Sequence, residues 1–273
     1  MDTTSPVAVG VPLGRTGLLV SRLGLGASYG LGQAGVLRAV ERGVNYLYWG
    51  SMRRPSFGRG VREAARRDRE RLVIVIQSYT RIAALLGPSL RLALRRLGIE
   101  YADVLLLGWW NREPSRRIVD AGRALVQRGL VRHLGVSTHE RPLAPVLARE
   151  AGPYGVLHVR YNAAHRGAER DIFPFLPAPP GGPGIVAFTA TRWGTLLSRP
   201  RGVPPDVPWP TATDCYRFCL TDPHVHVVLA GPANEGELEG ALLALDKGPL
   251  DPDDLARVRR AGDAVYGRGW APG

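Results

Sequence analysis

The sequence repeats one unit eight times: a short run rich in Val, Ile or Leu, followed by a helical pattern. The runs cover residues 23–26, 45–48, 72–77, 104–107, 133–137, 156–160, 184–189 and 225–229. Short apolar runs that alternate with helices are typical of a parallel sheet with both faces covered. Eight of them in 273 residues predict an α/β fold, a closed (β/α)8 TIM barrel. An open sheet would usually carry a glycine-rich phosphate turn after its first strand, and GLGASYG (24–30) does not have that form.

The residues before the first run predict a separate small element. The stretch VPLGRTGLLVSRLG (11–24) places the turn GRTG between two apolar segments. Such a pattern indicates a β-hairpin. We expect this N-terminal hairpin to plug the bottom of the barrel, and we expect residues 1–273 to form a single barrel domain.

Apolar segments and cysteines exclude several classes of protein. No run approaches the roughly 18 apolar residues that cross a bilayer. The first residues lack the basic lead and apolar centre of a signal peptide, so we expect a cytoplasmic protein without a membrane partner. Cys215 and Cys219 lie four residues apart in a helical pattern, a spacing poorly suited to a disulfide or a metal site, and we expect both in the core.

The net charge of +12 does not indicate a nucleic-acid partner. The only lysine is Lys247, and the arginines are dispersed rather than gathered in a stripe. A bias of arginine over lysine is more typical of a GC-rich bacterial genome than of phosphate binding. Because Lys247 follows a helix far along the chain from the strand ends, a Schiff-base mechanism is also excluded.

In a TIM barrel, working residues follow the C-terminal ends of the strands. Four of the six tryptophans stand at such positions, which predicts a wall that faces a small aromatic or polycyclic ligand. His139 and Glu140 could form a base and its orienting acid. His158 alternates with apolar residues, so it is either a catalytic residue or a hydrogen-bonded histidine inside the barrel. The expected substrate-binding residues are Trp49, Gln77, Trp109, Trp110, Arg192 and Trp193.

Several stretches, in this order, resemble the aldo-keto reductase superfamily over nearly the whole chain. They are LGRTGLLVSRLGLG (13–26), ERGVNYLYWGS (41–51), SLRLALRRLGIEYADVLLLGW (89–109), LVQRGLVRHLGVST (125–138), VRYN (159–162) and PLDPDDLARV (249–258). The resemblance implies a (β/α)8 barrel that binds NADPH across its C-terminal mouth and reduces carbonyl groups.

The resemblance also implies a catalytic tetrad of Asp, Tyr, Lys and His, and this sequence departs from it at each position. Tyr48 stands for the aspartate, Arg53 for the tyrosine, Gln77 for the lysine and Gly108 for the histidine. A carbonyl reduced without a matched proton donor loses a factor of about 10² to 10⁴. Arginine is a poor acid at its pKa, so Arg53 would at most stabilise an oxyanion.

Cofactor positions are retained only in part. Ser137 matches a serine that holds the nicotinamide carboxamide, whereas Thr138 and His158 replace an asparagine and a glutamine. Phe188 stands where a tyrosine stacks on the nicotinamide. Around the adenosine phosphate the family uses basic residues and a Glu-Asn pair, and Glu237 would face that phosphate with the wrong sign. The corresponding positions here are Gly231, Glu237, Gly240 and Ala241.

These departures favour one function and leave two others open. The favoured hypothesis is a cofactor-independent enzyme of small-molecule, secondary metabolism that guides dehydration, cyclisation or isomerisation. The alternatives are an NAD(P)H-dependent reductase with a relocated proton donor, and a ligand-binding pseudoenzyme without activity. The expected catalytic residues are Tyr48, Arg53, His139 and His158, and Ser137, Thr138 and Phe188 would bind a nicotinamide if NADPH is used.

Overall fold

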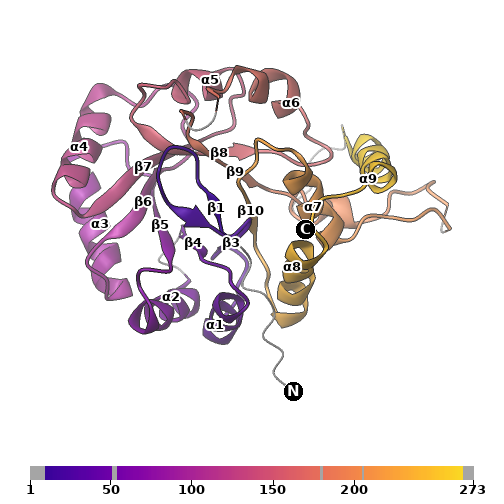
Figure 1. Cartoon of the computed structure of the whole chain (residues 1–273), viewed down its shortest axis with the longest axis horizontal. Helices are drawn as coiled ribbons and strands as arrows, with labels where there is room; N and C mark the ends of the chain where they lie inside the picture. Colours follow the sequence, from indigo (N-terminus) through magenta and orange to yellow (C-terminus); the bar gives the residue numbers. More distant parts are fainter. Residues whose placement is uncertain (1–9, 51–53, 179–180, 205, 267–273) are drawn as a thin grey trace.

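The computed structural model describes residues 10–50, 54–178, 181–204 and 206–266. Within them, eight parallel strands close into a barrel in the order β10-β3-β4-β5-β6-β7-β8-β9 (Figure 1). These strands are β3 (Leu23–Gly26), β4 (Tyr46–Trp49), β5 (Val73–Ser78), β6 (Ala102–Leu107), β7 (Val131–Thr138), β8 (Tyr154–Arg160), β9 (Gly184–Phe188) and β10 (Val227–Ala230). Each overlaps a predicted strand, so the predicted TIM barrel is confirmed.

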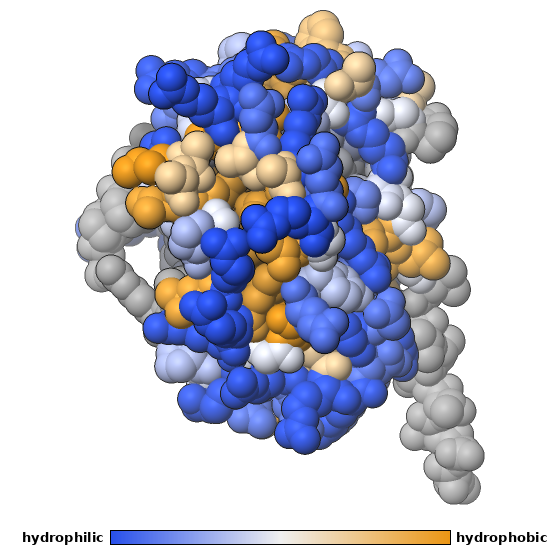
Figure 2. Space-filling view, turned by 90° about the vertical axis from the view of Figure 1, so that its left-hand side faces the viewer, coloured by the Kyte–Doolittle hydropathy of each residue, from blue (hydrophilic) through white to orange (hydrophobic). Residues whose placement is uncertain are grey.

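Helices form a layer outside the barrel (Figure 1). On the side that carries α3 and α4, the surface is mostly hydrophilic with smaller apolar patches (Figure 2), as expected for helices that bury one face. The helices are α1 (Gln33–Glu41), α2 (Pro55–Arg67), α3 (Ala83–Leu97), α4 (Arg116–Gln127), α5 (Leu143–Leu147), α6 (Ala168–Asp171), α7 (Ala212–Thr221), α8 (Glu235–Lys247) and α9 (Pro252–Val265), with short 3₁₀ turns η1 (Phe173–Phe175) and η2 (Thr195–Leu197).

Apolar side chains on the strands divide into two layers. Tyr46, Val75, Val104 and Leu106 are among those that fill the inside of the barrel. Their neighbours along each strand instead pack between the sheet and the helices, as Leu47 does. Successive residues of a strand point to opposite faces, and both faces are buried here. The strands therefore read as continuous apolar runs, which is why the sequence reveals them.

The predicted hairpin is present as the antiparallel pair β1 (Val11–Pro12) and β2 (Leu19–Val20). Leu13 and Val20 are fully buried and join the inner layer of the barrel. Arg15 donates a hydrogen bond to the Tyr154 carbonyl oxygen, 2.7 Å away, at the first residue of β8. Because the first residues of the barrel strands share one end, these contacts close the N-terminal end of the barrel and leave the opposite end for chemistry.

The described part of the chain bears on the predictions about a membrane partner and a metal site. No helix there is long and apolar enough to cross a membrane. No group of three or more His, Cys, Asp or Glu side chains there could hold a metal ion. Cys215 and Cys219 are free thiols buried in the core, as predicted, and burial raises the pKa of both.

Candidate functional site

The C-terminal end of the barrel carries unusual backbone conformations. Among the described residues, the non-glycine residues with positive φ are Trp109 (52°), Thr189 (60°), Arg192 (51°) and Trp193 (53°). They lie in the segments just after β6 and β9. Residues with a Cβ seldom adopt this conformation, and it persists most often at functional sites. The unusual conformations therefore lie at the C-terminal end of the barrel, where functional residues are expected.

An open cleft of about 810 Å³ lies at this end, between the loops that follow β5 and β6. Arg81 ties these loops together, because it donates to the Gly108 carbonyl oxygen at 3.0 Å and its guanidinium lies 4.0 Å from the centre of the Trp110 ring. Trp109 is 58% exposed. Aromatic faces and arginines on one wall suit a planar ligand. The lining residues are Tyr79, Arg81, Trp109, Trp110, Asn111, Arg112, Glu113 and Ser115.

His139 stands between two aromatic rings of different strands. Its ring centroid lies 5.5 Å from that of Trp109 and 5.2 Å from that of Phe188, which it meets edge-on. Burial, followed by the Arg160 charge, lowers the pKa of His139 below its ordinary 6.5, and Glu140 opposes the shift. At neutral pH the imidazole is therefore mostly neutral and able to accept a proton.

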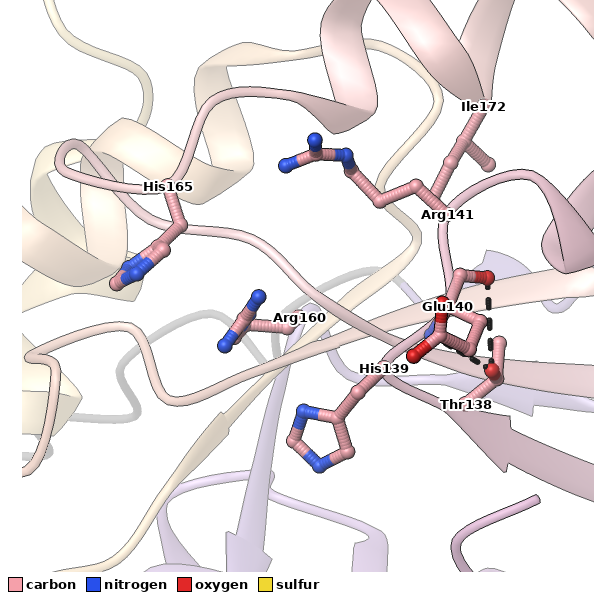
Figure 3. A pocket seen from close by; sticks show the side chains of 7 residues that line it. All are labelled: Thr138, His139, Glu140, Arg141, Arg160, His165 and Ile172. Atoms are coloured by element: carbon pink, nitrogen blue, oxygen red, sulfur yellow. Dashed lines mark hydrogen bonds between the residues drawn. The ribbon is translucent and has the colours of Figure 1, made fainter. Parts of the chain in front are cut away.

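A small cavity of about 10 Å³ lies on the other side of His139. Figure 3 shows the Arg160 guanidinium between the rings of His139 and His165, with Arg141 across the gap. Burial, then the charges of Arg160, Arg192 and Arg141, lower the pKa of His165 to about 4. The cavity is therefore a region of positive potential. Its lining residues are Thr138, His139, Glu140, Arg141, Arg160, His165 and Ile172.

Tyr48 and Gln77 form a hydrogen-bonded pair at the ends of β4 and β5. The Tyr48 hydroxyl donates to the Gln77 amide oxygen. A Cβ added at Gly108 would collide with the Gln77 amide nitrogen, so the glutamine side chain occupies the space that a larger residue at 108 would need. Burial raises the pKa of Tyr48 well above 10, and contact with Tyr79 raises it further. Tyr48 is therefore a neutral donor at neutral pH and a weak acid.

His158 belongs to the barrel interior rather than to the mouth. It is 2% exposed, and its Nε2 lies 2.8 Å from the hydroxyl of Tyr46, which is fully buried. Burial lowers the pKa of His158 to about 3. The prediction that His158 is catalytic has no support in this geometry, since the imidazole is buried and bonded to Tyr46. The other sequence interpretation, a hydrogen-bonded histidine inside the barrel, describes what is observed.

We expect His158 to make the protein acid-sensitive. Its pKa is about 3 when folded and about 6.5 when unfolded, so its contribution to stability is intact above pH 6.5 and is lost progressively as pH falls towards 3. At pH 5 this loss amounts to about 2 kcal/mol. Urea unfolding at pH 7.5 and pH 5 should show that His158→Gln, which does not titrate, loses about 2 kcal/mol less than the wild type. An equal loss in both proteins would contradict the assignment.

Three residues expected to bind substrate line neither of the two cavities described above. Trp49 is 4% exposed and packs in the outer layer beside α2, where its Nε1 donates to the Arg54 carbonyl oxygen at 3.4 Å. Arg192 is buried and donates to the carbonyl oxygen of Val265 in α9. Trp193 is exposed but lines neither of the two cavities. Residues adjacent along a strand or turn point in different directions, which is why a place after a strand end does not by itself bring a side chain to the cleft.

The other predicted residues divide between the mouth and the part not described. Trp109 and Trp110 line the cleft, although most of the Trp110 ring is buried. Gln77 is bound to Tyr48. Arg53 lies outside the described residues. The residues that sequence reasoning did not single out include Arg81, Arg112, Arg141 and His165, and the available signal was their place three to five residues beyond a strand end.

A model of the aldo/keto reductase family matches residues 48–205, more than half of the chain. The chain belongs to the aldo/keto reductase family. A stretch of 92 residues is 35% identical to a Saccharomyces cerevisiae protein named as the aryl-alcohol dehydrogenase AAD14, and 34% identical to one named as AAD10. The stretch spans 32% of this chain, 24% of AAD14 and 32% of AAD10.

Solved aldo/keto reductases share the fold. The holo form of aldo-keto reductase AKR11C1 from Bacillus halodurans has a TM-score of 0.78 at 20% identity, over 96% of this chain and 99% of that one. An aldo/keto reductase from Klebsiella pneumoniae in complex with NADP and acetate has a TM-score of 0.73 at 22% identity, over 94% and 96% of the two chains. At these identities the likeness shows the fold alone.

These findings overturn the favoured function. The matched family is that of the aldo/keto reductases and the matched yeast relatives are named as aryl-alcohol dehydrogenases, whereas the sequence favoured a cofactor-independent lyase or isomerase. The expectation that no cofactor is used rested on the same argument. The better supported hypothesis is the alternative, an oxidoreductase.

At the nicotinamide end, the aldo/keto reductase positions are partly suited to the cofactor. The Ser137 hydroxyl accepts from the Trp109 N–H at 2.8 Å, which leaves its own proton to donate. Phe188 is partly exposed at the end of β9. Thr138, in contrast, is buried, and its hydroxyl accepts from the Glu140 N–H at 2.9 Å. His158 is buried as well. The groups that fit the roles implied by the family resemblance are therefore the Ser137 hydroxyl and the Phe188 ring.

At the adenosine end, the residues do not suit a 2′-phosphate. The Glu237 carboxylate accepts from the Ala233 N–H at 2.9 Å and from the Asn234 amide at 3.1 Å, so it covers the N-terminus of α8 with negative charge. Gly231 lies beneath the Tyr29 ring, with which a Cβ there would collide, and a basic side chain at 231 would need that space. A dinucleotide without the 2′-phosphate fits this end better.

Proposed function

We propose that this protein is an NADH-dependent oxidoreductase that interconverts an aromatic alcohol and its carbonyl compound, with His139 moving the proton. The observation that carries the proposal is the place of His139. Its ring contacts Phe188, where the family resemblance places the nicotinamide, and Trp109, which lines the cleft. A group between two such surfaces is within reach of a substrate oxygen there.

The proton transfer follows from the charge state of His139. In alcohol oxidation the substrate gives up a hydride and a proton, and a neutral imidazole accepts the proton. A bound nicotinamide supplies the hydride acceptor, or the donor in the reverse direction. Because burial and Arg160 lower the pKa of His139, the neutral form prevails at neutral pH and favours the oxidation direction.

Tyr48 is the weaker candidate for this role. Its hydroxyl is already bound to Gln77, and its pKa is raised well above 10, far from the operating pH of a general acid. We further propose that the chain has exchanged the proton-donor arrangement of its family for another. The fit of Gln77 into the space beside Gly108 supports such an exchange, because these two residues are matched to each other in shape.

The substrate should be a flat aromatic molecule. The cleft of about 810 Å³ presents Tyr79, Trp109 and part of Trp110, with Arg81 and Arg112 at its margin. Aromatic rings of this kind stack on planar ligands, and they pack less closely against open aliphatic chains. The names of the yeast relatives, aryl-alcohol dehydrogenases, are in keeping with this chemistry.

Cofactor binding tests the proposal most directly. Titration of the protein with NADH should quench tryptophan fluorescence at micromolar concentrations, since Trp109 lies next to Ser137 and His139. NAD⁺ and benzyl alcohol, or NADH and benzaldehyde, should then turn over, as measured at 340 nm. Cinnamyl and naphthyl substrates widen the assay. A protein that neither binds NADH nor oxidises any of these alcohols would refute the proposed function.

A further inference from the structure

The basic cavity beside His139 holds more positive charge than its surroundings neutralise. Three elements build it: the loop after β7 gives Arg141, the end of β8 gives Arg160, and the loop after β8 gives His165 (Figure 3). Arg141 pairs with Asp171, 2.8 Å away. The guanidinium of Arg160 is half-buried and makes no hydrogen bond or ion pair with any side chain or carbonyl group in the described part of the chain.

A half-buried guanidinium that no side chain binds is free to donate charge-assisted hydrogen bonds to an incoming anion. Glu140 is the carboxylate that acts on Arg160 through space, but it is exposed, and the charges of Arg141 and Arg192 act in the opposite direction. Burial and these two arginines lower the pKa of Arg160. The balance of charge therefore favours an incoming anion over water.

The size of the cavity limits what can enter. A volume of about 10 Å³ admits roughly one atom the size of a water oxygen. A tetrahedral phosphate would need the side chains to move apart, whereas one oxygen of a planar carboxylate fits. The rest of a ligand would extend past His139, whose ring is in contact with Trp109 at the cleft.

We propose that this cavity binds the carboxylate of an aromatic acid, with Arg160 as its main partner, and that the substrate is therefore an aryl alcohol or aldehyde that also carries a carboxylate. The second half of this statement rests on the proposed function. The binding of an aromatic carboxylate does not, because it requires neither cofactor nor turnover.

Calorimetry with benzoate and with benzamide, its neutral isostere, tests the site in chloride-free buffer at low ionic strength. The wild type should bind benzoate at least about tenfold more tightly than benzamide, since charge-assisted hydrogen bonds are the difference. Arg160→Gln should bind benzoate at least about tenfold more weakly and benzamide unchanged. Arg66→Gln, at the far end of α2 and 76% exposed, is the matched control and should behave as the wild type.

The unmodified protein offers a second measurement, in case Arg160→Gln does not fold. An anion beside Arg160 would offset the charges that depress the pKa of His165, so benzoate should raise that pKa from about 4, as followed by NMR of the imidazole. Equal binding of benzoate and benzamide, or an unchanged His165, would overturn the proposal. So would an Arg160→Gln protein that loses affinity for NADH instead of benzoate, because the arginine would then serve the dinucleotide. Selective benzoate binding without NADH-dependent turnover would support the site and refute the proposed function.

Discussion

Replacing His139 with alanine should lower kcat/KM for the oxidation of an aryl alcohol by a factor of about 10² to 10⁴, the usual contribution of a positioned acid or base. The physical reason is that the ring between Phe188 and Trp109 would no longer be there to accept the proton. Steady-state kinetics at saturating NAD⁺, with the alcohol concentration varied up to saturation, measure the change in kcat/KM. NADH affinity, followed by fluorescence, should stay within about threefold if the role is proton transfer.

The pH profile distinguishes a proton-transfer role from a structural one. Oxidation needs the neutral imidazole, so kcat/KM should rise with pH through an apparent pKa below 6.5 and then level off. Reduction needs the imidazolium, so its kcat/KM should fall as pH rises through the same value. Both pH dependences should disappear in His139→Ala. If they persist, another group transfers the proton.

Two variants control for the assignment. Tyr48→Phe removes the competing donor, and because its hydroxyl is bound to Gln77 we expect less than a tenfold loss. His224→Ala removes an exposed histidine after α7 that interacts with Asp222, and it should have no effect on turnover. A large loss in Tyr48→Phe together with a small one in His139→Ala would reverse our assignment of the two residues.

The choice of cofactor is the second large effect that we expect. The wild type should use NADH with a kcat/KM at least tenfold above that for NADPH, because Glu237 covers the N-terminus of α8 where the family resemblance places the 2′-phosphate. Glu237→Arg would replace the repulsion between the Glu237 carboxylate and the 2′-phosphate of NADPH with a charge-assisted hydrogen bond. It should improve the NADPH to NADH ratio by about 10- to 100-fold, since each such bond contributes about 1.5–3 kcal/mol.

Glu235→Arg is the matched control for this prediction. Glu235 begins the same helix and carries the same charge, but its carboxylate does not reach back to the Ala233 N–H as that of Glu237 does. It should change the cofactor ratio by less than about threefold, in line with an exposed charge screened by solvent. A wild type that prefers NADPH would contradict the role of Glu237. An equal change of the cofactor ratio in Glu237→Arg and Glu235→Arg would show that net charge, and not the position of Glu237, sets the ratio.

Much of the barrel could be predicted because its strands are buried on both faces. Val104, Leu105 and Leu106 are apolar in succession, since the first and third fill the barrel and the second packs under the helices. Such runs are visible without knowledge of the neighbours. The hairpin was equally predictable, because GRTG combines a turn with apolar flanks on both sides.

The candidate site could be predicted only in part. Position after a strand end correctly brought His139 and Trp109 to the mouth. The same rule misplaced Trp49, which follows Tyr48 on one strand and so faces the helices. It also did not single out Arg141 and His165, whose loops bring them to Arg160 although the strand-end rule says nothing about how a loop turns.

Local periodicity and short motifs encode the order of elements, the closure of eight strands and the family positions at which usual residues are replaced, so these features can be read without the fold. What the replacement residues contact depends on the folded barrel. It paired Tyr48 with Gln77, buried His158 against Tyr46 and left Arg160 without a neutralising partner among the described residues. These outcomes depend on distances between side chains from different strands, and such distances follow from the closed barrel rather than from any one segment.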